Sequence, residues 1–400
     1  MASRKNNGDG TVYKYNNKWY AEIQNGKKPN GKPNVKKFSA KSEREVKRKL
    51  KEFKQQQGKF IKSLNSNKTT VKDYFENWLY DYKIYQLKEQ SFDRLESIVN
   101  KHIINEIGGY QFAQVTHDDI QNLINKKQKE KYSYSTIKKI YDALNACYTY
   151  DYNQGENDRI CINNPVYNIT INKQKIKTKK IIQSFTDDEI EKIKNEIFSN
   201  WNNGNRKYLY GEAYLLILNT GLRLGEALGL RNNIDLTPKK IYIGQTLITT
   251  KNRDKNGKIN SDTIRNQTKV IEGAKNKSSN RWIYLNDNAI EYIKYLKNLP
   301  RKEYCNALIV NKNGEQVTRQ AFIRQFQTIL KNAGIKDDKS NRRGVHTLRH
   351  TFATNLFKNG VDVKVVSKIL GHSSVKITYD TYIHIIESLE IEAMKSIPNI

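Results

Sequence analysis

A basic stretch with no apolar periodicity divides this chain in two. Residues 172–180 read Asn-Lys-Gln-Lys-Ile-Lys-Thr-Lys-Lys, and patterned segments rich in apolar residues lie on both sides of them. Because such a run cannot join a hydrophobic core, the 400 residues must fold as at least two bodies. We place a linker at residues 166–184. Its charge is typical of a tether that crosses a phosphate backbone, and a plain solvated spacer is the alternative.

The charge of the whole chain favours a polyanionic partner. The sequence has 71 Lys and Arg against 41 Asp and Glu, a net charge of +30. This excess runs through the patterned segments, which argues against a packing protein with basic tails and for a globular protein that binds nucleic acid. Affinity for a phosphate backbone should then fall steeply with salt.

Cysteines and apolar runs indicate the compartment. Cys147, Cys161 and Cys305 have no paired spacing, and no apolar run approaches the length of a signal peptide core or a membrane span. We therefore expect a cytoplasmic protein with no disulfide framework, no zinc knuckle and no membrane partner.

The first 65 residues predict a small basic module. Strand-like patterns occupy 11–15, 19–23 and 35–38, and a basic helix follows over about 42–57. Asn16-Asn17 between the first two strands indicates a tight hairpin. A module of three strands and a helix suits DNA binding, since strands can enter the major groove as well as helices can.

Two further regions complete the expected architecture. Residues 66–165 have helical apolar spacing over 70–79, 98–107, 118–127 and 135–150, which predicts a bundle of four or five helices. Residues 185–400 are mostly helical, and one strand region at about 240–285 interrupts them. The fold class is therefore mainly α with small β-sheets.

The first candidate motif for chemistry is His-Thr-Leu-Arg-His-Thr-Phe at 346–352. His346 and Arg349 share a helix face, and an imidazole beside a guanidinium suits a phosphate better than a cation. A zinc pair of His346 and His350 is the rival interpretation. It is the weaker one, because Thr347 stands where the HExxH motif has its glutamate.

Two other motifs become candidates for the same site because this one is present. An apolar helix ends at Gly221, Arg223 begins the next helical turn, and Glu226 is placed to brace an arginine or a histidine. Lys275 and Lys277 lie in a polar hairpin turn before a strand, from which a lysine can reach into a site.

The last motif makes the resemblance specific. Leu-Gly-His-Ser-Ser at 370–374 is followed by Tyr379 and Tyr382. The order Arg, Lys, His-x-x-Arg, Gly-His and Tyr resembles the tyrosine recombinases, or phage-type integrases, over essentially all of 185–400. The basic stranded module and the helical region in front resemble integrases of temperate phages and conjugative transposons.

The resemblance implies a mechanism without metal, nucleotide or other cofactor. In this family a tyrosine attacks a DNA phosphate and forms a 3′-phosphotyrosine with a free 5′-hydroxyl. Tyr382 matches this nucleophile, while Tyr379, seven residues after His372, is expected to pack. The other matches are two phosphate-gripping arginines, a proton-donating lysine, an acceptor of the tyrosine proton, a histidine on the phosphate and a supporting acid: Arg223 and Arg349, Lys275 (or Lys277), His346, His372 and Glu226.

The resemblance also implies an organisation and partners. It assigns residues 1–65 to arm-site DNA binding, 66–165 to core-site binding and 185–400 to a mixed α/β catalytic domain with a C-terminal tail. The expected partners are double-stranded DNA at core and arm sites, a homotetramer on two duplexes and an accessory protein for excision. The tail packs either on a neighbouring protomer or on its own chain. A type IB topoisomerase-like enzyme and a non-catalytic DNA-binding protein on the same fold are the alternatives.

Overall fold

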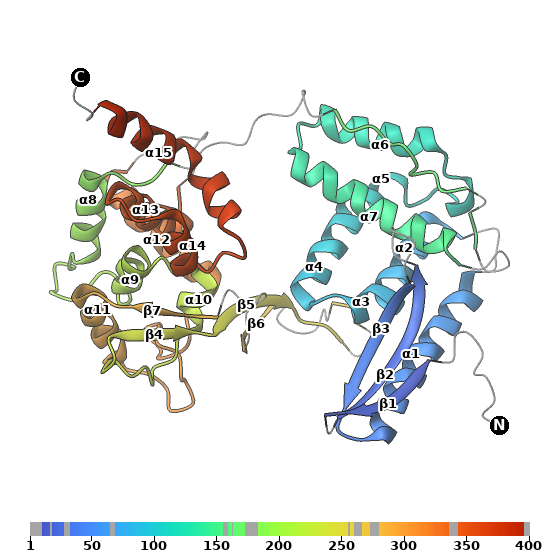
Figure 1. Cartoon of the computed structure of the whole chain (residues 1–400), viewed down its shortest axis with the longest axis horizontal. Coiled ribbons are helices and arrows are strands. Elements are labelled where there is room, and N and C mark those ends of the chain that lie inside the picture. The colour runs from blue at the N-terminus through green and yellow to red at the C-terminus, as the bar shows by residue number, and fades with distance from the viewer. Residues whose placement is uncertain are drawn as a thin grey trace. The chain divides into compact units, whose positions relative to one another are not determined.

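The computed structural model describes two compact units, which are coloured along the chain in Figure 1. The described residues are 10–16, 18–27, 33–64, 69–154, 159–161, 163–172, 183–254, 257–259, 266–272, 280–335 and 343–395. The first unit comprises 1–178 and 250–265, and the second comprises 179–249 and 266–400. The chain therefore crosses between units at 178–179, again at 249–250 and again at 265–266.

The first unit opens with the predicted sheet and helix. The antiparallel strands lie in the order β1 (Thr11–Tyr15), β2 (Lys18–Lys27), β3 (Pro33–Ala40). Asn16 has a φ of 46°, as a tight hairpin requires. Helix α1 (Glu43–Leu64) packs on the sheet and buries Val46, Leu50 and Phe53 against Ala21 and Ile23 (Figure 1).

A helical bundle follows, as the apolar spacing predicts. Its elements are α2 (Val71–Asn77), η1 (Trp78–Lys83), α3 (Ile84–Gln86), α4 (Glu89–Ile98), η2 (Val99–Ile104), α5 (Asn105–Ile107), the 3₁₀ turn η3 (Phe112–Gln114), α6 (His117–Lys129) and α7 (Tyr134–Tyr152). Thr70 and Thr116 close capping boxes that start α2 and α6. The π-helical segments η1 and η2 interrupt continuous helices, a feature that apolar periodicity does not reveal.

Asp151 is a buried anchor at the end of α7. Its carboxylate accepts hydrogen bonds from Tyr74 Oη at 3.0 Å and from the backbone N–H groups of Ile160 at 3.0 Å and Cys161 at 2.8 Å. The side chain is only 1% exposed. Asp151 therefore ties the segment after α7 to α2 and satisfies buried donors that would otherwise be unpaired.

Part of the strand region packs on α4 within the first unit. Glu96 of α4 is fully buried and accepts hydrogen bonds from Tyr80 Oη at 2.7 Å, Lys251 Nζ at 2.5 Å and Arg253 Nη2 at 2.8 Å. Arg253 also bonds Asp93. Burial by itself would raise the pKa of Glu96, but the bonds from Arg253 and Lys251 lower it to about 2.

The second unit is mainly helical and contains two pairs of short strands among its described residues. Its helices are α8 (Asp187–Ile197), α9 (Glu212–Thr220), α10 (Leu224–Gly229), α11 (Asp287–Lys297), α12 (Arg319–Asn332), α13 (Val345–Lys358), α14 (Val363–Leu370) and α15 (Val375–Lys395). Its strand pairs are β4 (Lys240–Ile243) with β7 (Arg281–Tyr284), and β5 (Gln245–Lys251), whose last two residues belong to the first unit, with β6 (Asn266–Glu272).

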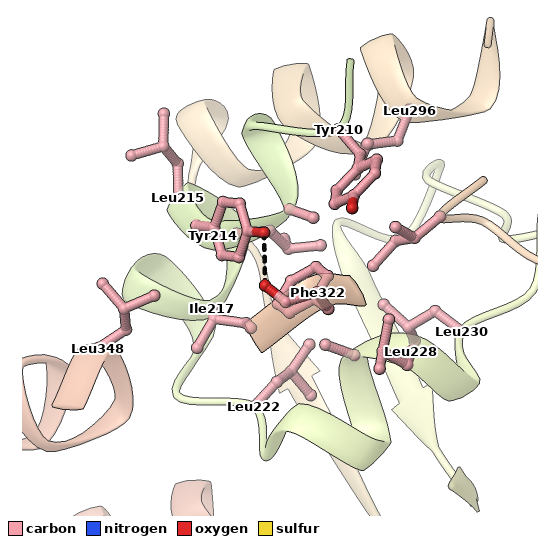
Figure 2. Close-up of a cluster of buried hydrophobic side chains, with 14 of the residues drawn as sticks. Tyr210, Tyr214, Leu215, Ile217, Leu222, Leu228, Leu230, Leu296, Phe322 and Leu348 are labelled. Carbon is pink, nitrogen blue, oxygen red and sulfur yellow. Dashed lines mark hydrogen bonds between the residues drawn. The ribbon is translucent and has the colours of Figure 1, made fainter. Parts of the chain in front are cut away.

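Helix α9 lies at the centre of the second unit's core. Figure 2 shows Tyr214 of this helix against Phe322, with Ile217 and Leu222 close by. The Tyr214 hydroxyl donates to the Phe322 carbonyl at 2.9 Å, which satisfies a polar group inside an apolar cluster. This packing fixes the C-terminal end of α9, where Gly221 and Arg223 follow. Among the described residues, no helix is long and apolar enough to cross a membrane.

We expect Asp151→Ala to lower the free energy of unfolding by about 3 kcal/mol, because buried donors lose their acceptor. Asp142→Ala on the same helix is the matched control. Asp142 is half exposed and pairs with Lys138 across one helical turn, so its loss should cost under about 0.5 kcal/mol. Urea unfolding of both variants measures the difference, and equal losses would contradict the anchoring role.

Candidate active site

The C-terminal end of α14 gathers the arginines of the site. Three consecutive carbonyls accept hydrogen bonds from three different guanidinium groups: Ile369 from Arg281 Nε at 2.6 Å, Leu370 from Arg349 Nη2 at 2.7 Å and Gly371 from Arg223 Nη2 at 2.8 Å. The last carbonyls of a helix lack intrahelical partners and carry partial negative charge. The helix end therefore both fixes the three cations and offsets part of their mutual repulsion.

Gly371 makes this end of α14 possible. It closes the helix with a φ of 65°, a left-handed conformation that favours glycine. A Cβ at this position would lie 2.8 Å from Nη1 of Arg281, which leaves no room for a side chain. The turn thus brings backbone, guanidinium group and the following His372 together.

Arg349 connects two helix ends. It lies on α13, is 3% exposed and donates through Nη1 to the carbonyl of Gly221 at 2.7 Å, in addition to its bond with Leu370. Gly221 closes α9 with a φ of 65°. Burial and the neighbouring positive charge of Arg223 lower the pKa of Arg349 to about 9, so the guanidinium group is charged but poorly solvated at neutral pH.

Glu226 is the carboxylate that the arginines share. It accepts from Arg223 Nη1 at 2.8 Å and from the Arg223 backbone N–H at 2.9 Å, which caps α10. It also accepts from Arg281 Nη1 at 3.1 Å and Nη2 at 2.9 Å. Burial would raise the pKa of Glu226, but the bonds from Arg281 and the charge of Arg223 bring it below its usual value.

His372 supports Arg349 in its neutral form. Its Nε2 lies 3.0 Å from Arg349 Nη2, and its Nδ1 lies 2.7 Å from Thr378 Oγ1. Because a guanidinium group only donates, Nε2 must accept and Nδ1 must carry the proton. Burial and the charges of Arg349 and Arg223 lower the pKa of His372 to about 4, in agreement with this tautomer.

Tyr382 lies beside this cluster. Helix α15 buries its ring, which is 3% exposed, against Phe357, Val366 and Leu370. Burial raises the pKa of Tyr382 to about 12, although the charge of Arg349 acts in the opposite direction. Tyr379 on the same helix is 42% exposed, so the prediction that it packs within the chain is wrong. Tyr379 lies in the first turns of α15, where Val375 and Ile377 are exposed as well.

Two histidine rings of α13 lie in a row that leads to the ring of Tyr382. The ring centroids of His346 and His350 are 4.7 Å apart, and those of His350 and Tyr382 are 5.5 Å apart. His346 is exposed, whereas Arg349 is buried, although the two share a helix face. Surrounding protein atoms and the charge of Arg349 lower the pKa of His346, which favours a neutral ring able to accept a proton.

Most of the residues that the sequence singled out thus lie in one place. Arg223, Glu226, Arg349 and His372 are linked by hydrogen bonds, and His346 and Tyr382 are next to them. Lys275 and Lys277 lie outside the described residues. Sequence reasoning missed Arg281 and Thr378. For Arg281 the only signal is a charged residue at an inward position of an otherwise apolar strand.

The cluster suits a phosphate diester. Three arginines and one glutamate carry a net charge of 3 − 1 = +2 around a neutral histidine. Such preorganised donors stabilise charge that develops on an oxyanion. In the part of the chain that the structure describes, no group of three or more His, Cys, Asp or Glu side chains could hold a metal ion.

Comparisons with known proteins agree with this geometry. Residues 183–388 match the model of the phage integrase family, and residues 70–128 match the N-terminal SAM-like domain of phage integrases. A tyrosine recombinase XerC-like protein of Caldanaerobacter subterraneus subsp. tengcongensis is 27% identical, over 97% of this chain and 98% of its own length. Tyrosine recombinase XerD of Staphylococcus saprophyticus is 38% identical over 27% of this chain and 37% of its own length.

Solved structures share the fold. The integrase of transposon Tn1549 in complex with a circular intermediate DNA has a TM-score of 0.58 at 20% identity, over 77% of this chain and 94% of that one. A lambda integrase dimer bound to a COC′ core site has a TM-score of 0.56 at 16% identity, over 95% of this chain and 96% of that one.

The low pKa of His372 predicts a pH-dependent stability. The unfolded chain takes up a proton near pH 6.5, whereas the folded one does so only near pH 4, so stability is lost as pH falls through this window. We expect the stability difference between wild type and His372→Gln to shrink by about 2 kcal/mol from pH 7.5 to 4.5. Urea unfolding at several pH values measures it, with His117→Gln at an exposed position of α6 as control. A difference independent of pH would contradict the neutral tautomer.

Proposed function

The chain belongs to the phage integrase family, and on this premise we propose that it is a site-specific DNA recombinase of a mobile element, which cuts and rejoins strands through a 3′-phosphotyrosine. The observation that carries the proposal is the shared contact of Arg223, Arg349 and His372 around the end of α14, with Tyr382 packed against the same helix. A charged, preorganised cluster of donors beside a buried tyrosine fits attack on a phosphodiester.

In the proposed reaction the Tyr382 hydroxyl attacks phosphorus and the bond to the 5′-oxygen breaks. The tyrosine proton passes to a base, which we assign to His346, because a phenol with a pKa of about 12 is a poor nucleophile at neutral pH. The electron pair of the broken bond goes to the 5′-oxygen, which takes a proton from Lys275. One phosphodiester replaces another, so no nucleotide is consumed, and the 5′-hydroxyl of a partner strand reverses the step.

Arg223 and Arg349 are proposed to bind the non-bridging oxygens, on which negative charge builds during the attack. Each such donor contributes roughly 3–4 kcal/mol by analogy with oxyanion holes. His372 is proposed to hydrogen-bond the phosphate. In the structure its Nε2 accepts from Arg349, so donation to the phosphate requires the proton to move from Nδ1 to Nε2, with Nδ1 then accepting from Thr378 Oγ1.

We propose partners from the charge and the relatives. A net charge of +30 favours double-stranded DNA. Solved relatives include a lambda integrase tetramer bound to a Holliday junction, and we propose the same tetrameric assembly here, with an accessory protein for excision. Residues 1–65 are assigned to arm sites, 66–165 to core sites and 185–400 to catalysis. The stranded basic module favours recombination over topoisomerase activity. Three free cysteines suit a cytoplasmic location.

The nucleophile can be tested with a nicked duplex from the ends of the element that flanks the gene, in the presence of EDTA. The nick lets the short cleaved piece diffuse away and traps the adduct. We expect wild type and Tyr379→Phe to form a covalent protein–DNA band on a denaturing gel. Tyr382→Phe should bind the duplex and form none.

A covalent band from Tyr382→Phe would disprove the assignment of the nucleophile. Tight, salt-sensitive binding by wild type without any adduct would instead favour a non-catalytic DNA-binding protein.

The general acid can be tested with a duplex in which sulfur replaces the bridging 5′-oxygen. A thiol has a pKa of about 8.5 and leaves without a proton. We expect Lys275→Ala to cleave normal DNA about 10²–10⁴-fold more slowly and to regain the wild-type rate on the sulfur substrate. Lys277→Ala is the matched control. If only Lys277→Ala is rescued by sulfur, Lys277 is the acid.

A further inference from the structure

We propose that Arg281 is a positioning residue for strand cleavage, which acts by holding Glu226 and the end of α14 so that Arg223 faces the phosphate. This inference rests on the proposed function. Arg281 is 7% exposed, and its Nε, Nη1 and Nη2 atoms already donate to the Ile369 carbonyl and the Glu226 carboxylate. Its influence on the reaction must pass through the groups that it contacts.

Arg281 occupies an inward position of β7. It pairs in register with Ile243 of β4, on the strand face that Ile283 also shares, where an apolar side chain would be usual. A buried guanidinium group is costly unless its donors are paired. Here Nε bonds Ile369, and both Nη atoms bond the Glu226 carboxylate. The strand therefore carries a charge that is bonded to two elements of the site, Glu226 on α10 and the C-terminal end of α14.

These contacts form a continuous path to Arg223. The Glu226 carboxylate accepts hydrogen bonds from the Arg281 guanidinium group. It also accepts hydrogen bonds from the side chain and the backbone N–H of Arg223. Arg223 also donates to the carbonyl of Gly371. This carbonyl lies two residues beyond that of Ile369, which accepts from Arg281. Moving Arg281 would thus shift both supports of Arg223.

The path also has an electrostatic consequence. The charged or titratable groups around Glu226 are Arg223 at the start of α10, Arg281 on β7, Arg349 on α13 and His372 after α14. Burial opposes the ionised carboxylate, and the bonds from Arg281 are the largest influence in its favour. Without Arg281, Glu226 should take up a proton at higher pH and release Arg223 when it does.

This consequence separates positioning from a general structural role. A residue needed only for folding would reduce the fraction of active protein to a similar extent at every pH. A residue that keeps Glu226 ionised should matter more as the solution becomes acidic. The expected deficit grows by roughly tenfold for each pH unit below the pKa that Glu226 acquires in the variant.

The experiment compares Arg281→Met with wild type in single-turnover formation of the covalent adduct on the nicked duplex, at saturating DNA from pH 6 to 9. We expect the variant to bind DNA with unchanged Kd and to cleave at least about tenfold more slowly at pH 6, because protonated Glu226 no longer holds Arg223. The ratio to wild type should recover toward pH 9. Adding Glu226→Gln to the variant should make this ratio independent of pH.

Arg301→Met is the matched control. Arg301 also donates to backbone carbonyls at a helix end, those of Lys297 at 2.7 Å and Leu296 at 3.0 Å, but it contacts no residue of the site in these bonds. Its cleavage rate should equal that of wild type. Arg281→Lys retains the charge beside Glu226 with fewer donors, so it should cleave more slowly than wild type at a ratio that does not change with pH.

Several outcomes would overturn the inference. They are full activity of Arg281→Met, a deficit equal at every pH, or a loss of DNA binding that accounts for the lower rate. If Arg281→Met fails to fold, the result with Arg281→Lys tests the inference instead. A wild-type cleavage rate of Arg281→Lys, or a deficit that grows at low pH, would overturn the inference. Absence of an adduct with wild type itself would instead overturn the proposed function and with it this inference.

Discussion

The site depends on how the fold holds three guanidinium groups close together against their mutual repulsion. One carboxylate and the carbonyls at one helix end offset that repulsion. Arg223, Arg281 and Arg349 each donate to a different carbonyl at the end of α14, and two of them share Glu226. Charge-assisted hydrogen bonds of this kind contribute roughly 1.5–3 kcal/mol each, which is enough to hold cations that would otherwise separate. The left-handed turn at Gly371 ends α14 and leaves its last carbonyls available to the three arginines.

The same arrangement keeps His372 neutral, whereas Tyr382 remains protonated because of its burial. Excess positive charge and burial disfavour protonated His372, and burial outweighs Arg349 in setting the pKa of Tyr382. The surplus charge that lowers the pKa of Arg349 would be relieved by a bound anion. Part of the free energy of phosphate binding is therefore stored as strain between like charges, as is common in sites that trade stability for function.

Local patterns predicted much of this molecule, and contacts between distant residues explain what they could not. The helix end at Gly221 and the group of Arg223, Glu226, Arg349 and His372 were visible in short motifs. Arg281 was not, because its partners lie 55 and 88 positions away. The π-helical turns and the exposure of Tyr379 depend on tertiary packing, which a single sequence does not display.

The excursion of residues 250–265 limits how modular this chain can be. Glu96 on α4 is buried with Lys251 and Arg253, which the chain supplies only after it has entered the second unit and left it again. A buried carboxylate that loses its cations costs about 3–5 kcal/mol. A chimera that joins residues 1–178 to the remainder of a relative would therefore contain the buried carboxylate of Glu96 without Lys251 and Arg253. Replacing Glu96 should therefore be tolerated best when Lys251 and Arg253 are replaced with it.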